Sequence, residues 1–240
     1  MLTRRHFVLT TTALFSAPKA VLGQEAADPS LHPAPDETLP EPAKRAPVSD
    51  RSKWDLWDAQ VTPPNYDPFT SNPWGLAPRF LPHIVEANPG LEPGSIHVDA
   101  VARYLYHILD NGMAIRYGVA IARGNLYEPG TYRIGRKVKW PTWTPTANMI
   151  KRDPFYEKYK NGVDGGPLNP LGSRALYLYE GNRDTYLRIH GSPHPESIGG
   201  RASSGCVRMV MAHIIHLYPN VEIGTTAILY PAEEMLGAAS

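Results

Sequence analysis

The distribution of proline restricts the fold of this chain more than any other feature of its sequence. Fourteen of the 25 prolines lie between Asp28 and Pro93. Proline fixes φ and has no backbone N–H, so it interrupts helix interiors and central strands. Residues 28–50 are also rich in Ala, Glu and Asp, and we expect them to form a disordered or extended spacer. A packed domain is therefore expected only after this region.

The later part of the proline-rich region carries too many aromatic side chains for a simple linker. These are Trp54, Trp57, Tyr66, Phe69, Trp74 and Phe80. We expect residues 54–82 to form irregular coil that lies over the following domain and buries several of the rings; alternatively, this segment lines a binding groove. Residues 24–93 are thus predicted to be a Pro-rich spacer followed by an irregular aromatic segment.

From Gly94 the composition becomes that of a mostly β domain, which we place at residues 94–235. A domain of about 145 residues is large enough for one hydrophobic core. Alternating apolar residues predict strands at 96–98, 103–109, 113–121, 130–134, 176–179, 186–190 and 225–230. The dipeptide Asn111-Gly112 predicts a hairpin turn, and one helix is expected over 210–218, before Pro219. Short strands with Gly and Pro between them favour a sandwich or barrel-like architecture.

Residues 1–23 have the features of an export signal. Arg4 and Arg5 precede a short apolar run to Ala17 and small residues near Gly23. The run is shorter than the about 20 residues that span a bilayer. The paired arginines and the weak hydrophobicity are typical of a twin-arginine signal. We expect cleavage after Gly23 and a periplasmic location; an uncleaved N-terminal anchor is the alternative.

The charge balance gives no reason to expect a nucleic-acid partner. The chain carries 24 basic and 23 acidic residues, and residues 1–23 contain three basic residues and no acid. Removal of the signal would leave 21 basic and 23 acidic residues, a net charge of −2. We expect no membrane span after the signal, because no other segment is long and apolar enough.

The candidate catalytic residues lie in the stretch from 189 to 209. Cys206 is the only cysteine, and it follows His190 by 16 positions. A thiol becomes a strong nucleophile as the thiolate, so it needs a nearby imidazole or positive dipole. One cysteine with one histidine is sufficient for acyl transfer through a thioester. The alternative for Cys206 is a buried structural cysteine beside a turn.

The strand predicted at 186–190 sets the direction of His190. Alternation places Leu187 and Ile189 toward the core, and Arg188 and His190 toward the opposite side. His190 then lies at the end of the strand, where it can reach a returning loop and act as general base. Arg188 is a candidate for substrate contact on the same side.

The loop before the predicted helix is a candidate oxyanion site. Residues just before a helix carry unpaired N–H groups and a partial positive charge, which lower a thiol pKa and bind an oxyanion. We assign this role to the N–H groups of Gly205 and Cys206, with Ser204 as a further donor. Ser203 is a further substrate-contact candidate. Arg208 either grips a substrate carboxylate or ties the loop to a buried acid.

A long insertion between the predicted strands is expected to affect specificity. Residues 140–172 begin with Trp140, contain Tyr156 and Tyr159, and are rich in Pro and Gly. Loops of this kind often carry specificity. We expect the insertion to form a lid or a wall of the groove, with Trp140 contacting substrate; an ordered surface excursion is the alternative, and residues 54–82 are a rival lid.

The motif around Cys206 resembles that of the L,D-transpeptidase catalytic domain (the YkuD-type fold). The matching positions are His190, Gly191, Ser203, Gly205, Cys206 and Arg208. Ser204 departs from the pattern, because the family usually has histidine there. The resemblance implies a mostly β YkuD-type sandwich or barrel with a short helix after the cysteine. It also implies His190 as base, and a Gly191 carbonyl that orients the imidazole.

The resemblance also implies a reaction. Cys206 would attack a peptidoglycan tetrapeptide stem, release D-alanine and pass the acyl group from a thioester to a second stem, giving a 3→3 crosslink. Carbapenems should acylate the same thiol. The acceptor stays open: a stem amine, water in an L,D-peptidase, or a lysine of an outer-membrane protein. A non-catalytic peptidoglycan-binding module is the alternative from another class, with Ser204 as its sign.

No cofactor is implied, and a metal site is disfavoured. His194, His213 and His216 accompany Cys206, but the chain has no Cys-x-x-Cys or His-Glu-x-x-His pattern. A metal would also occupy the thiolate that the chemistry needs.

Overall fold

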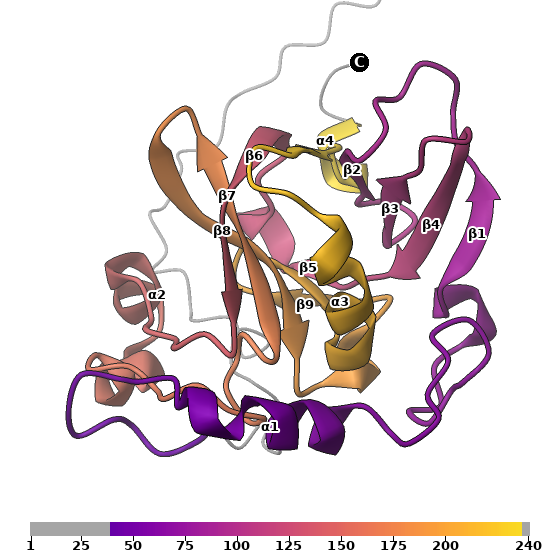
Figure 1. Ribbon diagram of the computed structural model, residues 1–240. Coiled ribbons are helices and arrows are strands. Elements are labelled where there is room, and N and C mark those ends of the chain that lie inside the picture. The colour runs from indigo at the N-terminus through magenta and orange to yellow at the C-terminus, as the bar shows by residue number, and fades with distance from the viewer. Residues whose placement is uncertain (1–38, 237–240) are drawn as a thin grey trace, which may run out of the picture.

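A computed structural model describes residues 39–236 of the protein. These residues form a mostly β fold built on one mixed sheet of nine strands, with helices on its sides and lower end (Figure 1). A second sheet has only two strands, β5 and β9. The expected mostly β class with a short helix after the cysteine is confirmed.

The strands of the large sheet are given in spatial order. They are β1 (His83–Glu86), β4 (Met113–Gly118), β3 (Tyr104–Ile108), β2 (Ile96–Asp99), β11 (Thr226–Leu229), β6 (Gly130–Lys139), β7 (Arg174–Glu180), β8 (Arg183–Ser192) and β10 (Val207–Val210). The small sheet pairs β5 (Ile121–Ala122) with β9 (Arg201–Ser203). The α-helices are α1 (Trp54–Val61), α2 (Ala147–Arg152), α3 (Met211–Leu217) and α4 (Glu233–Leu236). The 3₁₀ helices are η2 (Arg51–Lys53), η3 (Pro78–Phe80), η4 (Gly124–Leu126), η5 (Pro154–Tyr159), η6 (Pro195–Ser197) and η7 (Tyr218–Asn220).

Two parallel contacts determine the topology of the large sheet. β11 lies parallel to β2 and antiparallel to β6, so it joins the two halves of the sheet. β10 lies parallel to β8 at one edge. The remaining neighbours are antiparallel. The second parallel contact positions the functional site, because it aligns the end of β8 with the start of β10.

The hairpin from β3 to β4 forms where Asn111-Gly112 predicts it. Gly112 has φ +75°, a conformation that costs glycine little. The Asn111 side chain accepts the N–H of Met113 at 3.1 Å and closes the turn. The return strand is split, because β4 ends at Gly118 and the chain continues into β5 of the small sheet.

The core lies between the large sheet and the segments that cover it. Ile96, Leu105, Ile134 and Ile189 are fully buried members of this core. Ile214 of α3 is fully buried in the same cluster. Each such side chain contributes about 1.5–3 kcal/mol through removal of apolar area from water.

Helix α1 differs from the coil expected for residues 54–82. The interval between Pro47 and Pro63 contains no proline, so a short helix can form there. The 3₁₀ helix η2, which leads into α1, is capped by Asp50, whose side chain accepts the N–H of Ser52 at 3.1 Å. Strand β1 also lies before the expected domain start at residue 94, and it pairs with β4.

An ion pair attaches α1 to the sheet. Asp58 accepts two hydrogen bonds from Arg174 of β7, at 2.9 and 2.6 Å. The indole N–H of Trp140 also donates to Asp58, at 3.1 Å. The rings of Trp57 and Trp140 meet edge to face with centroids 5.3 Å apart. The segment before the family-like domain is therefore part of the same packed unit.

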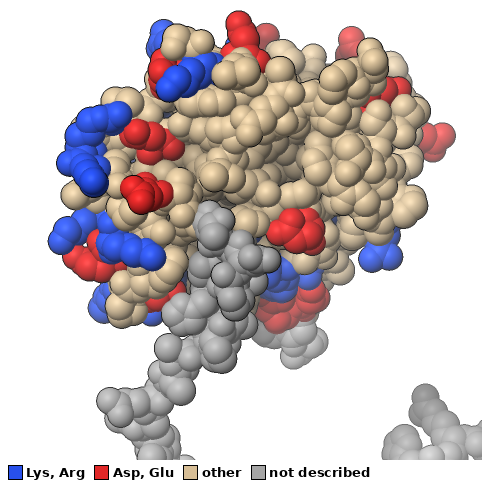
Figure 2. All heavy atoms as spheres, turned by 90° about the horizontal axis from the view of Figure 1, so that it is seen from below, with Lys and Arg blue, Asp and Glu red and all other residues tan. Residues whose placement is uncertain are grey.

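Three further aromatic residues of the N-terminal segment, Tyr66, Phe69 and Trp74, pack against α3. Trp74 and Tyr66 contact the ring of His213, with centroids 5.8 and 6.5 Å away. Phe69 meets His216 edge to face at 5.6 Å. This segment lies along the lower end of the molecule in Figure 1. Viewed from below, a broad area without charged side chains occupies the middle of that face (Figure 2).

The expected signal at residues 1–23 and the part of the expected spacer at residues 28–38 lie outside the described residues. Between residues 39 and 236, no helix is long and apolar enough to cross a membrane.

Candidate active site

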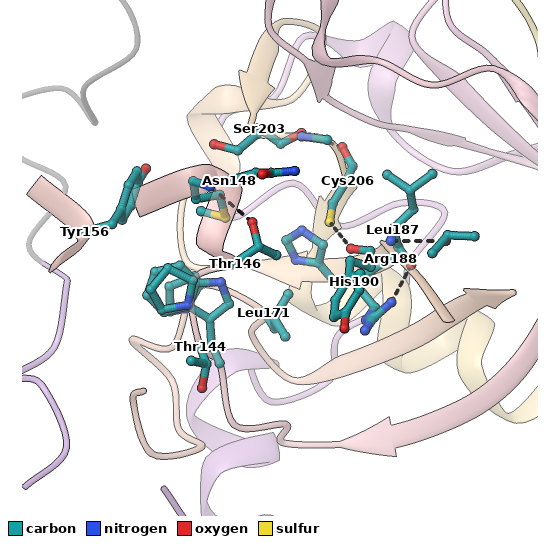
Figure 3. A pocket seen from close by; sticks show the side chains of 18 of the residues that line it. Thr144, Thr146, Asn148, Tyr156, Leu171, Leu187, Arg188, His190, Ser203 and Cys206 are labelled. Carbon is teal, nitrogen blue, oxygen red and sulfur yellow. Dashed lines mark hydrogen bonds between the residues drawn. The ribbon is translucent and has the colours of Figure 1, made fainter. Parts of the chain in front are cut away.

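A cavity of about 760 Å³ opens beside the end of β8. One wall is formed by β8 and by the loop at 203–206, and the facing wall by the insertion at 142–156 with Pro170 and Leu171. Figure 3 shows Cys206, His190 and Arg188 grouped on one side, with Thr146 and Tyr156 toward the other.

His190 lies on β8, and Cys206 lies in the loop directly before β10, the parallel neighbour of β8. His190 lies opposite Arg208 in the β8–β10 register, and Ile189 lies opposite Val207. Cys206 directly precedes β10, so its side chain enters the cavity beside that of His190 (Figure 3). The two residues are 16 positions apart in sequence but belong to one wall of one cavity.

The tautomer of His190 follows from its hydrogen bond. Its Nδ1 lies 2.6 Å from the carbonyl oxygen of Gly191. A carbonyl can only accept, so Nδ1 carries the hydrogen and Nε2 presents its lone pair. Burial, together with the positive charge of Arg208, lowers the pKa of His190 to about 3, and the Gly191 bond opposes this shift. The imidazole is therefore neutral near pH 7 and can accept a proton.

Cys206 is partly buried, and its Sγ lies 3.8 Å from the carbonyl oxygen of Tyr186. Burial raises the pKa of the Cys206 thiol, while the positive charge of Arg188 lowers it in part. The resting pair is thus a neutral thiol beside a neutral imidazole. Attack would then require the proton to leave sulfur as the new bond forms.

The prediction that the positive end of a helix dipole lowers the pKa of this thiol is wrong. Strand β10 (Val207–Val210) separates Cys206 from α3, which begins only at Met211. Dipole effects fall off within one turn of a helix end. The positive field at Cys206 comes instead from Arg188 and Arg208.

Ser203 closes the turn that precedes Cys206. Its hydroxyl donates to the carbonyl of Cys206 at 2.5 Å and accepts the N–H of Gly205 at 3.3 Å. Gly205 has φ +146°, which side chains rarely adopt. Ser203, Ser204 and Gly205 all line the cavity. The Gly205 N–H expected to bind an oxyanion is thus bonded to Ser203 in this structure.

Ser204 contacts the insertion. Its side chain forms a hydrogen bond with Tyr156 of η5, which also lines the cavity. Burial raises the pKa of the Tyr156 phenol, and the Ser204 bond works against this shift. The residue that replaces the family's usual histidine is therefore a link between the nucleophile loop and the facing wall.

Arg188 and Arg208 both line the cavity. Arg188 is 8% exposed, forms hydrogen bonds with Asp184 at 2.7 and 2.9 Å, and lies over the Tyr177 ring at 3.8 Å. The backbone of Arg208 pairs with Ala120. Two cationic side chains beside the nucleophile suit a substrate that carries carboxylates.

Trp140 does not contact the cavity, contrary to expectation. It is fully buried against Trp57, and its indole N–H is bonded to Asp58. Its position at the end of β6 turns the side chain toward α1. Of the two rival lids, the insertion at 142–156 supplies the cavity wall, whereas residues 66–74 pack on α3.

Sequence reasoning did not identify several residues of the cavity, among them Tyr186 and Leu39. Leu39 lies at the start of an extended segment, residues 39–48, which is hydrogen-bonded to the insertion. The N–H of Ala43 donates to Gly162 at 2.8 Å, and the N–H of Val48 donates to Asp164 at 2.9 Å. This part of the expected spacer is ordered by contacts with residues that are more than 100 positions away.

No group of three or more potential metal ligands occurs within residues 39–236. His213 is fully buried among aromatic rings, and the Nδ1 of His216 lies 2.8 Å from the Tyr117 hydroxyl.

Comparison with known proteins places this site in context. The profile of the YkuD L,D-transpeptidase catalytic domain matches residues 93–229, more than half of the chain. A probable L,D-transpeptidase ErfK/SrfK of Escherichia coli (strain K12) is 31% identical, with 60% of this chain and 54% of that protein covered. A putative L,D-transpeptidase YqjB of Bacillus subtilis (strain 168) is also 31% identical, with 51% and 62% covered. The chain thus spans less than two thirds of the length of either relative.

A solved structure from Brucella melitensis, described as a probable carnitine operon oxidoreductase, is 47% identical. The match covers 62% of this chain and 93% of that one, with a TM-score of 0.45.

Proposed function

Because this chain belongs to the L,D-transpeptidase catalytic domain family, we propose that it is a periplasmic acyltransferase that forms 3→3 crosslinks between peptidoglycan stem peptides. Membership of the family implies acyl transfer on peptidoglycan peptides. The observation that supports the specific proposal is the placement of His190 on β8 and of Cys206 directly before the adjacent strand β10, in the wall of one cavity.

The first half of the reaction is acylation of the enzyme. Nε2 of His190 takes the thiol proton as Sγ of Cys206 attacks the carbonyl that precedes the terminal D-alanine of a donor stem. The carbon–nitrogen bond breaks, and the imidazolium returns its proton to the leaving amine. D-alanine departs, and a thioester remains on Cys206. We assign stabilisation of the oxyanion to the backbone N–H groups of Ser204 and Cys206, because that of Gly205 is bonded to Ser203.

The second half transfers the acyl group. An amine from the side chain of a diamino acid in a second stem attacks the thioester carbonyl. His190 takes a proton from the attacking amine and gives it to the departing thiolate, which restores the thiol. Arg208, which lines the cavity, is proposed to bind a carboxylate of the donor stem, and Arg188, whose guanidinium is held by Asp184, adds positive charge to the same wall.

The test is incubation of the mature chain with a purified disaccharide tetrapeptide, followed by mass spectrometry. A crosslinked dimer that has lost one D-alanine supports the proposal. A free tripeptide would show water as the acceptor, and unchanged substrate would favour a wall-binding module. A lysine-bearing peptide, added in a parallel reaction, tests a protein as acceptor. Cys206→Ala is the control and should give no product, with substrate binding retained.

A carbapenem gives an independent check of the nucleophile. One covalent adduct is expected on the wild-type chain and none on Cys206→Ala. His190→Gln should retain the thiol but form the adduct at least 100-fold more slowly, because general-base assistance is lost.

A further inference from the structure

The hairpin of β7 and β8 is irregular directly beside the nucleophile. Tyr177 pairs with Arg188, and Tyr179 pairs with Asp184. Between these two pairs β7 advances by two residues and β8 by four, so β8 has two extra residues at this point. Bulges of this kind often occur next to active sites, where they redirect side chains or backbone groups.

Side-chain hydrogen bonds replace the missing ladder bonds of the bulge. The hydroxyl of Thr185 donates to the carbonyl of Leu178 at 2.7 Å and accepts the N–H of Leu187 at 3.2 Å. Asp184 accepts the N–H of Tyr186 at 2.8 Å. The same carboxylate holds the guanidinium of Arg188 through both oxygens. Asp184 thus bonds to groups on both sides of the extra residues.

Tyr186 has a conformation that tyrosine rarely adopts. Its φ is +64°, and the residue is 69% exposed at the cavity. A left-handed conformation costs an L-residue about 1–2 kcal/mol. Packing of the exposed ring cannot offset this cost, so the bonds of Asp184 and Thr185 must hold the backbone in place.

The strained backbone contacts the sulfur of Cys206 from two positions. The carbonyl oxygen of Tyr186 lies 3.8 Å from Sγ and accepts the thiol hydrogen. The backbone N–H of Arg188 also bonds to the sulfur, and this contact favours the thiolate. The bulge therefore offers one group that holds the thiol proton and one that stabilises the anion left behind.

We propose that Asp184 is a positioning residue for Cys206: by holding the left-handed turn at Tyr186, it places backbone groups of residues 186 and 188 against the sulfur. This inference rests on the proposed function of Cys206 as nucleophile. Asp184 has two opposed effects, because its own negative charge disfavours the thiolate while the geometry it holds favours it. The two effects can be separated by substitution.

The experiment measures the rate of alkylation of Cys206 by iodoacetamide from pH 6 to 10. Cys206 is the only cysteine, so a single adduct by mass reports this thiol alone. Asp184→Asn keeps an oxygen that accepts the Tyr186 N–H and removes the charge. Its alkylation at pH 7 should rise about three- to tenfold, since one pKa unit is a factor of ten in thiolate. Asp184→Ala removes charge and acceptor together, and its rate should fall below that of the wild type.

Two further variants test the backbone conformation directly. Tyr186→Val places a β-branched residue in the left-handed region and should slow alkylation more than Tyr186→Gly, because glycine adopts positive φ without strain. Glu180→Gln is the charge control, since Glu180 is an exposed acid in the same hairpin that is bonded to Arg183. Thermal unfolding of each variant identifies any that fail to fold.

The proposal fails if Asp184→Ala accelerates alkylation as Asp184→Asn does, because charge alone would then explain the effect. It also fails if both variants match the wild type, or if Tyr186→Val and Tyr186→Gly react equally fast. Alkylation requires no peptidoglycan. If the variants show the expected alkylation rates but the wild-type chain does not crosslink the tetrapeptide, the proposed function is refuted and the role of Asp184 stands.

Discussion

His190 and Arg208 occupy opposed positions in the parallel pair of β8 and β10, which places a guanidinium charge beside a buried imidazole. Burial and this charge both act in one direction and disfavour the imidazolium. The base of the proposed reaction is therefore neutral over a wider range of pH than an exposed histidine would be.

The first prediction concerns the pH–rate profile of acylation by a carbapenem, and in particular its acid limb, where the rate falls as pH is lowered. A histidine with a pKa of about 3 stays neutral above that value, so the rate should not fall near pH 6.5 as pH is lowered. Between pH 5 and 7 the wild-type rate should change less than about threefold. Arg208→Gln removes the positive charge, raises the pKa of His190 and should move the acid limb to higher pH. A wild-type rate that falls tenfold from pH 7 to 5.5 would contradict this account.

The second prediction concerns the hydrogen bond between Tyr156 and Ser204. Tyr156→Phe removes the hydroxyl and retains the ring, so kcat/KM for the donor should fall about fivefold, the effect of about 1 kcal/mol. Ser204→Ala should cost a similar amount. The double variant should cost no more than either single one, because both remove the same bond. Additive losses would show that the two side chains act independently.

The third prediction concerns the attachment of α1 to the sheet. Arg174 has a side chain that is 5% exposed, while that of Asp58 is 30% exposed. Asp58→Ala would leave a buried guanidinium without its carboxylate and should lower the free energy of unfolding by about 2–3 kcal/mol in urea. Asp55→Ala, on the exposed side of the same helix, is the matched control and should cost less than about 0.5 kcal/mol. Equal losses for both variants would mean that only helix propensity matters.

The fourth prediction concerns acid stability. Burial lowers the pKa of His213 to about 3 in the folded protein, against 6.5 as its ordinary value. The unfolded chain therefore binds a proton that the folded chain does not, and stability falls as pH drops from 6.5 toward 3. His190 contributes a loss of the same sign. His213→Phe should remove on the order of 2 kcal/mol of the loss between pH 7 and 4.5.

The control for this measurement is His83→Gln, because His83 is exposed on β1. Urea titrations at pH 7 and 4.5 give the difference for each chain. If His213→Phe and the wild type lose the same free energy on acidification, His213 is not buried in its neutral form.

Much of the sheet could be predicted from the sequence because its strands alternate. Ile96 and Val98 carry the period-two signal of β2, and Asn111-Gly112 marks the turn after β3. The sequence does not reveal the short strand β10. Val207 and Met209 alternate with Arg208, but the strand has only four residues and the apolar helix α3 follows directly, so periodicity cannot separate the two elements.

Part of the candidate site can also be predicted from local sequence. The spacing of His190 and Cys206 and the alternating direction of side chains along a strand can both be read from a short stretch of the chain. The orientation of the Trp140 side chain cannot, because its hydrogen-bond partner Asp58 lies 82 positions away. Tyr186 depends on a bulge, which arises from the pairing of two strands and not from either strand alone.

The placement of β11 has a consequence for biosynthesis. Residues 226–229 lie between β2 and β6, and they are the last strand of the described chain to leave the ribosome. Until they emerge, the nascent polypeptide can form at most two half-sheets, each with an unpaired edge. Such edges favour aggregation during translation. Completion of the sheet must therefore wait for residues 226–229, and premature termination before residue 226 should yield a product for chaperones or proteases.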